Sequence, residues 1–129
     1  NKKTKCLYAI KAVSKNQIEY EKLIENIEME RGVLLKIDHP FIVKLVKCMK
    51  NQKHLFYLME YVRGKELWDI IREIGLLNKT QTSFYSASIM LALDYLHSRK
   101  IIYRDIKPEN IFINNGVFKL GFLYIKIIY

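Results

Sequence analysis

Residues 103–110 bring together the side chains of this sequence that are best suited to chemistry. An aspartate, a lysine and an asparagine stand close together there, and Asp105 and Asn110 are five positions apart. A carboxylate can accept a proton, an amide oxygen can hold a cation, and an ammonium group can neutralise negative charge. A lone aspartate in a loop is usually a turn residue, but the combined string predicts a catalytic loop.

Two further charges, those of Lys11 and Glu30, are expected on apolar faces. Residues 7–13 predict a strand, on which Lys11 shares a face with Leu7, Ala9 and Val13. Residues 16–37 predict a long helix, on which Glu30 shares a stripe with Leu23, Ile27 and Leu34. A buried charge needs a counter-charge, so each side chain can satisfy the other. The alternative is that both charged ends reach from the surface into water.

Strands follow this helix. Residues 38–40 end it, because the residue before a proline avoids the helical region. The next strands are predicted at residues 42–49 and 55–59, with a hairpin turn between them at residues 51–53. Residues 60–65 then form a short connector that contains a glycine.

The second half of the chain is predicted to be mostly helical. Residues 66–74 form a short helix that ends before Gly75, and Asn78 is the N-cap of a helix that runs to about residue 98. This second helix is apolar nearly all round, which is typical of a helix buried in a larger protein. A strand at residues 111–113, an Asn-Gly turn and a strand at residues 117–120 complete the pattern as a hairpin.

The string at residues 103–110 resembles the catalytic loop of protein kinases, in which His-Arg-Asp is followed by four residues and Asn. The Tyr-Ala-Ile-Lys sequence at residues 8–11 is similar to the kinase strand Val-Ala-Ile-Lys, and Glu30 resembles the glutamate that pairs with its lysine. This resemblance extends over residues 7–120 and implies a truncated α+β fold of two lobes. The implied parts are a β-rich lobe at about residues 1–59, a hinge at 60–65 and a helical lobe at 66–129.

The resemblance implies ATP-dependent phosphoryl transfer to serine or threonine of proteins, with ATP and Mg²⁺ as cofactors. Asp105 is then the catalytic base, Lys107 neutralises charge on the transferred group, and Asn110 binds Mg²⁺. Lys11 and Glu30 form the clamp on the ATP phosphates. Lys107 also favours serine and threonine over tyrosine as the target.

Tyr103, in place of the usual histidine, and the Met-Glu-Tyr-Val sequence at residues 59–62 are similar to AGC kinases, above all to those that depend on cGMP or cAMP. The adenine-binding residues that this implies are the gatekeeper Met59, the hinge residues Glu60 and Val62, and Ala9 and Phe112 above and below the ring. The apolar ones among them are equally compatible with an ordinary core.

Glu66 and Glu109 match acidic positions that receive basic residues of the substrate peptide in this family. The resemblance therefore implies a protein substrate with Arg or Lys upstream of the target residue. The alternative is that both glutamates are ordinary surface charges.

Two parts of the kinase pattern are absent from this sequence. No glycine-rich loop precedes Leu7, and Leu120 is followed by Gly121-Phe122 rather than Asp-Phe-Gly, whose aspartate holds Mg²⁺. No aspartate occurs after Asp105. We therefore expect the 129 residues alone to transfer phosphate negligibly. A truncated or frame-shifted gene product explains this best, before a pseudokinase segment and a short splice form.

Composition limits the other possibilities. Half of the residues are hydrophobic, which indicates a globular protein, and the net charge of +9 comes from scattered lysines, so we expect a general basic surface and no nucleic-acid partner. No apolar run reaches the roughly 20 residues of a membrane span. Cys6 and Cys48 form no CxxC pair, which predicts buried free thiols in an intracellular, cytoplasmic protein.

The chain begins without a methionine or a signal peptide, and we expect it to start inside a longer protein whose regulatory domains lie outside it. Two other functions stay open: a scaffold or binding module on a degenerate kinase fold, and a small-molecule phosphotransferase. The complete set of Lys11, Glu30, Asp105 and Asn110 speaks against the first. The Lys-Pro-Glu context at residues 107–109 and the Met-Glu-Tyr hinge speak against the second.

Overall fold

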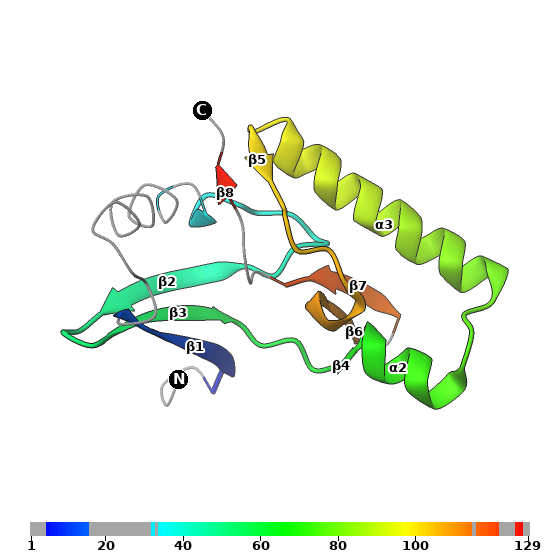
Figure 1. The fold of residues 1–129 in the computed structure, drawn as a ribbon, viewed down its shortest axis with the longest axis horizontal. Coiled ribbons are helices and arrows are strands. Elements are labelled where there is room, and N and C mark those ends of the chain that lie inside the picture. Colours follow the sequence, from blue (N-terminus) through cyan, green and yellow to red (C-terminus); the bar gives the residue numbers. More distant parts are fainter. Residues whose placement is uncertain (1–4, 16–31, 33, 115, 122–125, 128–129) are drawn as a thin grey trace. The chain divides into compact units, whose positions relative to one another are not determined.

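Figure 1 shows the computed structural model of the chain, which describes residues 5–15, 32, 34–114, 116–121 and 126–127. The chain divides into two compact units, and each contains its own β-sheet. The first unit comprises Asn1–Asp38 and Lys44–Tyr61, and the second comprises His39–Val43 and Val62–Tyr129.

The first unit is built on an antiparallel sheet with the strand order β1 (Tyr8–Ser14), β3 (His54–Glu60) and β2 (Leu45–Lys50). The side chain of Asn51 fixes the turn between β2 and β3. Its Oδ1 accepts hydrogen bonds from the N–H groups of Lys53 at 2.8 Å and His54 at 2.7 Å. Asparagine suits this place because its short side chain can imitate a backbone turn. The predicted hairpin is confirmed.

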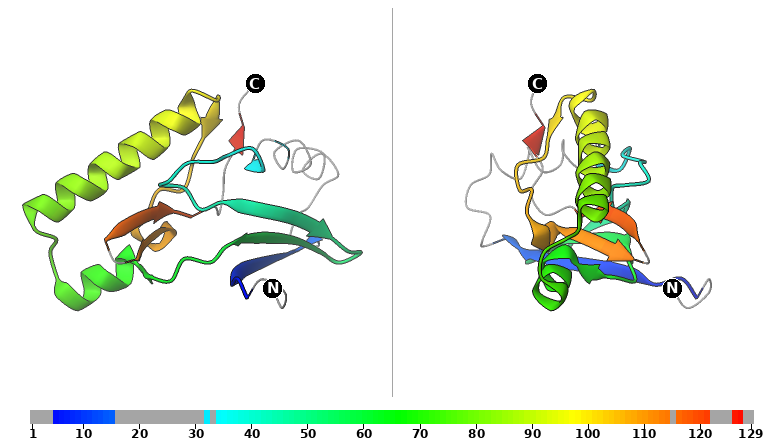
Figure 2. Two further views of the ribbon diagram at one scale, coloured as in Figure 1. Left: turned by 180° about the vertical axis from the view of Figure 1, so that it is seen from behind. Right: turned by 90° about the vertical axis from the view of Figure 1, so that its right-hand side faces the viewer.

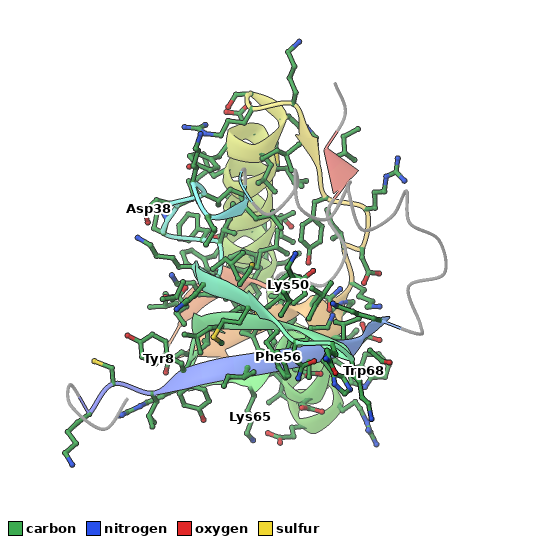
Figure 3. All side chains as sticks on the ribbon, turned by 90° about the vertical axis from the view of Figure 1, so that its left-hand side faces the viewer. Tyr8, Asp38, Lys50, Phe56, Lys65 and Trp68 are labelled. Carbon is green, nitrogen blue, oxygen red and sulfur yellow. The ribbon has the colours of Figure 1, made fainter. Side chains whose placement is uncertain are left out.

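β1 shows the alternation that its sequence predicts. Ala9, Lys11 and Val13 are half-buried, whereas the residues between them are exposed. Tyr8, at the start of β1, and Phe56, on β3, are labelled in Figure 3. The predicted strand is confirmed, with its boundaries shifted by one residue, and Lys11 does lie on the less exposed face.

The predicted helix at residues 16–37 lies mostly outside the described residues. Of its described positions, Gly32 and Leu34 are helical. The N–H of Ile37 donates to the carbonyl of Leu34 at 3.2 Å, and the side chain of Ile37 is only 1% exposed. Asp38, labelled in Figure 3, follows outside the helix and forms an ion pair with Lys44 at 3.0 Å.

The strand predicted at residues 42–49 begins later than expected, at Leu45. Residues 39–43 belong to the second unit, where they run beside β7 (Val117–Leu120). The N–H of Leu120 donates to the carbonyl of Phe41, and the N–H of Val43 donates to the carbonyl of Leu120, both at 2.8 Å. The prediction was wrong here because this pairing joins segments far apart in the chain.

Two helices dominate the second unit (Figure 2). α2 (Leu67–Ile74) ends at Gly75, whose φ of 79° favours glycine. α3 (Lys79–His97) begins with a capping box, in which Asn78 and Gln81 each accept a hydrogen bond from the other's backbone N–H, at 2.9 and 3.0 Å. Both predicted helices are confirmed.

The strands of the second unit form two small sheets. β4 (Lys65–Glu66), β6 (Ile111–Asn114) and β7 lie side by side in that order, and β5 (Ile101–Ile102) pairs with β8 (Lys126–Ile127). The hairpin of β6 and β7 was predicted, whereas β4, β5 and β8 were not. Each of these three strands has only two residues, so no period of alternation exists for a sequence to reveal.

The core of the second unit lies between α3 and β7. Phe118, Leu120, Ala92 and Leu96 are all 0% exposed. The other side of α3 carries apolar side chains that are largely exposed, among them Met90. Ser88 is buried, and its hydroxyl donates to the carbonyl of Phe84 four residues earlier, at 2.9 Å.

The cysteines differ in part from the expectation. Neither Cys6 nor Cys48 forms a disulfide, as predicted. Cys6, however, is exposed and Cys48 is half-buried, so the prediction of buried thiols was wrong. Cys6 lies in the segment that precedes β1.

Candidate active site

The loop at residues 103–110 connects β5 to β6, and buried residues hold both of its ends. Ile101 before the loop is 0% exposed, Tyr103 is 2% exposed, and Ile111 after the loop is 2% exposed. The last three residues form the 3₁₀ turn η2 (Pro108–Asn110), which has proline at a position where its missing N–H costs nothing. The polar side chains of the loop are therefore carried on a fixed backbone.

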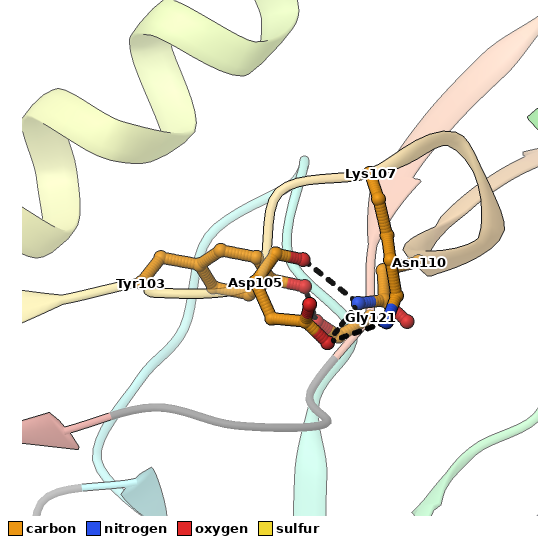
Figure 4. A network of polar contacts seen from close by, with 5 residues as sticks. All are labelled: Tyr103, Asp105, Lys107, Asn110 and Gly121. Carbon is orange, nitrogen blue, oxygen red and sulfur yellow. Dashed lines mark hydrogen bonds and ion pairs between the residues drawn. The ribbon is translucent and has the colours of Figure 1, made fainter.

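Asn110 is the most buried polar residue of this loop, with 0% exposure. Its Nδ2 donates to the backbone carbonyl and to the Oδ2 of Asp105, both at 2.8 Å, and its backbone N–H donates to the carbonyl of Lys107 at 3.0 Å. Figure 4 shows the contacts between Asn110 and Asp105 from close by. They draw the loop into a closed turn with the asparagine amide at its centre.

The Oδ1 of Asn110 is the one buried side-chain oxygen or nitrogen without a hydrogen-bond partner in the described part of the chain. Leaving such an atom unsatisfied costs about 1–3 kcal/mol. An amide oxygen is also an ordinary ligand for hard cations such as Mg²⁺. The chemistry of the orphaned Oδ1 therefore fits a Mg²⁺ ligand, and this role of Asn110 stays a prediction.

Asp105 and Lys107 form an ion pair, with 3.0 Å between Oδ2 and Nζ. The side chain of Asp105 is 24% exposed and that of Lys107 is 44% exposed, so both can be reached from solvent. The same Oδ2 accepts from Asn110 (Figure 4). The carboxylate is thus oriented by two donors, an arrangement that suits a general base, and an ammonium group stands beside it to balance negative charge.

Tyr103 and Gly121 make a contact that the sequence did not reveal. The hydroxyl of Tyr103 donates to the carbonyl of Gly121 at 2.6 Å (Figure 4). Burial, and to a smaller extent the negative charge of Asp105, raises the pKa of Tyr103 well above its usual range. The hydroxyl therefore keeps its proton and remains a donor. The only feature of the sequence that could have indicated this hydrogen bond was the tyrosine in place of the expected histidine at position 103.

The nucleotide-binding residues predicted in the first unit are Ala9, Lys11, Met59 and Glu60, and all four are half-buried. Ala9 lies directly opposite Met59 in the sheet. The N–H of Glu60 donates to the carbonyl of Lys44, and the carboxylate of Glu60 accepts from the Lys44 N–H, both at 3.0 Å. These bonds fix the end of β3. Glu30 lies outside the described residues.

The second unit holds the remaining predicted residues. Val62 is half-buried, and its carbonyl accepts from the N–H of Gly64 at 3.0 Å. Phe112 on β6 is half-buried and pairs with Glu66 on β4. Glu66 is half-buried and Glu109 is exposed, and α2, which follows Glu66, packs against η2, which contains Glu109.

A cation at this loop has few candidate ligands among the residues that the structure describes. Within the described ranges, no three His, Cys, Asp or Glu side chains gather into a group that could hold a metal ion. Position 121, whose carbonyl accepts a hydrogen bond from Tyr103 of the loop, is a glycine and offers no side-chain ligand. The structure thus presents Asn110 and Asp105 together, and the aspartate of the Asp-Phe-Gly pattern has no counterpart after Leu120 in the sequence.

The loop geometry, the sheet of the first unit and the helical second unit together define a class of protein. Residues 1–127 match the protein kinase domain family, and the chain belongs to it. The predicted fold class, α+β and kinase-like, is thereby confirmed. Protein kinases use ATP as the phosphoryl donor. No helix in the described part of the chain is long and apolar enough to cross a membrane.

The similar proteins are AGC-type kinases, as the hinge and Tyr103 predicted. The chain is 48% identical over 118 residues to the cGMP-dependent protein kinase of Plasmodium berghei. The matching residues make up 91% of this chain and 14% of that protein. It is 40% identical over 115 residues to the cAMP-dependent protein kinase catalytic subunit of Dictyostelium discoideum (89% and 18%). It is 43% identical over 110 residues to human 3-phosphoinositide-dependent protein kinase 1 (85% and 20%). The chain thus spans a small part of the length of these relatives.

Proposed function

We propose that the chain is part of the catalytic domain of a serine/threonine protein kinase of the cyclic-nucleotide-dependent type. The observation that carries this proposal is the network of Asp105, Lys107 and Asn110, because it joins a carboxylate, an ammonium group and an orphaned amide oxygen in one loop. Phosphoryl transfer needs these three groups, since its catalysis consists mainly of positioning and charge stabilisation.

Each side chain of the loop has a distinct role in this proposal. Asp105 orients the serine or threonine hydroxyl of the substrate and accepts its proton. Lys107 offsets negative charge on the transferred phosphoryl group. Asn110 holds Mg²⁺ through Oδ1, and Mg²⁺ when bound offsets the charge repulsion of the ATP phosphates. Its Nδ2 meanwhile keeps Asp105 in place.

Nucleotide binding is proposed for seven further residues, each taken by itself within its own unit. Lys11 contacts the ATP phosphates, with Glu30 as its counter-charge. Five other residues meet the adenine: Ala9, Met59, Glu60, Val62 and Phe112. The half-buried position of Lys11 on an otherwise apolar strand face supports this role, because a lysine there needs a negative partner.

Glu66 and Glu109 are proposed to receive basic residues of the protein substrate. The packing of β4, which contains Glu66, against η2, which contains Glu109, supports this, because it brings the two elements that carry these carboxylates together. Their negative charge beside the loop favours Arg or Lys upstream of the target residue. Regulation by cGMP or cAMP is part of the same proposal, and it needs domains outside this chain.

The 129 residues by themselves are expected to transfer phosphate negligibly. The sequence runs from Leu120 to Gly121 and Phe122 and contains no aspartate beyond Asp105. One carboxylate ligand of Mg²⁺ is therefore absent, and with it a large electrostatic contribution to catalysis. This same observation favours the second candidate function, a binding module or scaffold on a degenerate kinase fold.

A chimera separates the two candidates. In it, residues 5–120 replace the matching segment of the Plasmodium berghei relative, so that the relative supplies the sequence after Leu120. We expect the chimera to phosphorylate a serine peptide with upstream arginines, and to prefer it at least tenfold over a peptide with upstream glutamates, as judged by kcat/KM. The 129-residue chain should show negligible transfer to either peptide.

Two variants of the chimera test the role of Glu66. Glu66→Gln should raise KM for the basic peptide, whereas Asp69→Asn, at an exposed position in α2 just after Glu66, should leave it unchanged. Equal rates on the two peptides would remove the basic-context proposal. A folded chimera without phosphate transfer would favour the scaffold instead.

A further inference from the structure

Gly121 holds both ends of the loop at residues 103–110. Its carbonyl accepts from the Tyr103 hydroxyl at 2.6 Å, and its N–H donates to the carbonyl of Asn110 at 2.8 Å. We call these two hydrogen bonds the Gly121 clamp. Gly121 is buried and follows β7 directly, so the end of that strand fixes the first and the last residue of the loop.

Neighbouring atoms leave too little room for a side chain at position 121. A Cβ atom on Gly121 would lie 2.8 Å from Cε2 of Phe112 and 3.2 Å from the carbonyl oxygen of Asn110. The first distance is too short for two carbon atoms, and the second involves the acceptor atom of the Gly121 clamp. Two glycines of the described chain have positive φ, Gly75 and Gly116, and Gly121 does not. Backbone conformation therefore does not explain the glycine.

The backbone of Phe112 has limited freedom to move away. It lies in the middle strand of its sheet, where it pairs with Glu66 on β4 and with Lys119 on β7. A methyl group at position 121 must therefore push the Phe112 ring aside or lengthen the bond to Asn110. Asn110 is fully buried, so a shift of its backbone also moves its amide.

We propose that Gly121 is a positioning residue for Asn110, and that Phe112 makes glycine necessary there. The Gly121 clamp fixes the backbone of Asn110, Asp105 accepts from Nδ2, and Oδ1 is left aimed as a cation ligand. The cation part of this inference rests on the proposed function. The dependence of the Asn110 amide on Gly121 and Phe112 stands on geometry alone.

The test uses the 129-residue chain, ¹⁵N-labelled, with Mn²⁺ as the probe cation. Mn²⁺ affinity is measured by electron paramagnetic resonance, and the Asn110 side-chain NH₂ signals are followed by NMR. Gly121→Ala should weaken Mn²⁺ binding about tenfold, as is usual for a residue that orients a metal ligand, and should shift the NH₂ signals. Gly32→Ala is the matched control, because no described residue comes within 4 Å of its added Cβ.

The coupling to Phe112 is tested by a double-mutant cycle. Gly121→Ala should cost less Mn²⁺ affinity in a Phe112→Leu background than in the natural chain, because the ring that opposes the methyl group is gone. Additive effects would overturn the role of Phe112. A folded Gly121→Ala chain with unchanged Asn110 signals and unchanged Mn²⁺ affinity would overturn the whole inference.

Two other outcomes are also decisive. If the natural chain binds no Mn²⁺, the proposed metal site fails, and the Asn110 NH₂ signals alone decide whether Gly121 positions the amide. If Gly121→Ala does not fold, recovery of the fold on adding Phe112→Leu supports the inference. A double variant that stays unfolded contradicts it.

Discussion

Asn110 has every hydrogen-bonding atom but one satisfied by residues of its own loop or by Gly121. Its Nδ2 and backbone N–H both donate inside residues 103–110, while its carbonyl accepts from Gly121. The Oδ1 alone has no partner among the described residues. The spacing of Asp105 and Asn110 predicted which residues meet, because five positions suffice to close a turn. It did not predict Gly121, because nothing local in the sequence marks a contact between positions 103 and 121.

At the same scale, the Tyr103 hydroxyl should contribute measurably to stability. Tyr103→Phe removes the donor and leaves the Gly121 carbonyl buried without it, so the free energy of unfolding should fall by about 1–3 kcal/mol in urea titrations. Tyr61→Phe, at a residue that is 50% exposed, should change it by less than about 0.5 kcal/mol. Equal effects of the two substitutions would show that the buried hydrogen bond contributes nothing.

The raised pKa of Tyr103 gives this prediction a pH dependence. The unfolded chain releases the tyrosine proton near the ordinary value of 10.0, whereas the folded chain retains it to higher pH. The stability that Tyr103 contributes is therefore complete below about pH 10 and is lost as the pH rises above it. The difference in unfolding free energy between the natural chain and Tyr103→Phe should shrink above that pH. A constant difference would contradict the burial of the hydroxyl.

The elements show which kinds of signal a sequence carries. Asn78 predicted the start of α3 and Gly75 the end of α2, because caps are local arrangements of neighbouring residues. The start of β2 was predicted wrongly, because residues 39–43 pair with β7, far away in the chain. β8 was not predicted either, since its pairing with β5 joins residues 126–127 to residues 101–102. Non-local pairing of short segments leaves no periodicity to detect.

Gly64 tests how closely the connector before β4 packs on β6. A Cβ atom on Gly64 would collide with the carbonyl oxygen of Ile113 and lie 2.7 Å from its carbon, and both are backbone atoms that cannot turn aside. Gly64→Ala should therefore lower the free energy of unfolding by about 1–3 kcal/mol in thermal or urea unfolding. Gly32→Ala, in a helical and open position, should raise it by roughly 0.5–1 kcal/mol. Similar changes in both variants would contradict the close approach of the connector to β6.

On the scale of the whole molecule, the division into a β-rich lobe, a hinge at residues 60–65 and a helical lobe stays a prediction. The division between the two units after Tyr61 falls within residues 60–65, but residues 39–43 belong to the second unit rather than to the first. Phe84, Met90 and Leu91 on α3 are 46%, 69% and 56% exposed. Such a surface favours association, so the chimera is a better vehicle for activity than the isolated chain.

The dependence of phosphate transfer on Asp105 tests the central claim most directly. In the chimera, Asp105→Asn removes the proton acceptor while keeping the shape of the side chain, and kcat should fall by about 10²–10⁴-fold. Asp94→Asn, at an exposed position on α3, should leave kcat unchanged. A folded Asp105→Asn chimera with the same kcat as its parent would show that this loop is not the catalytic centre of a kinase.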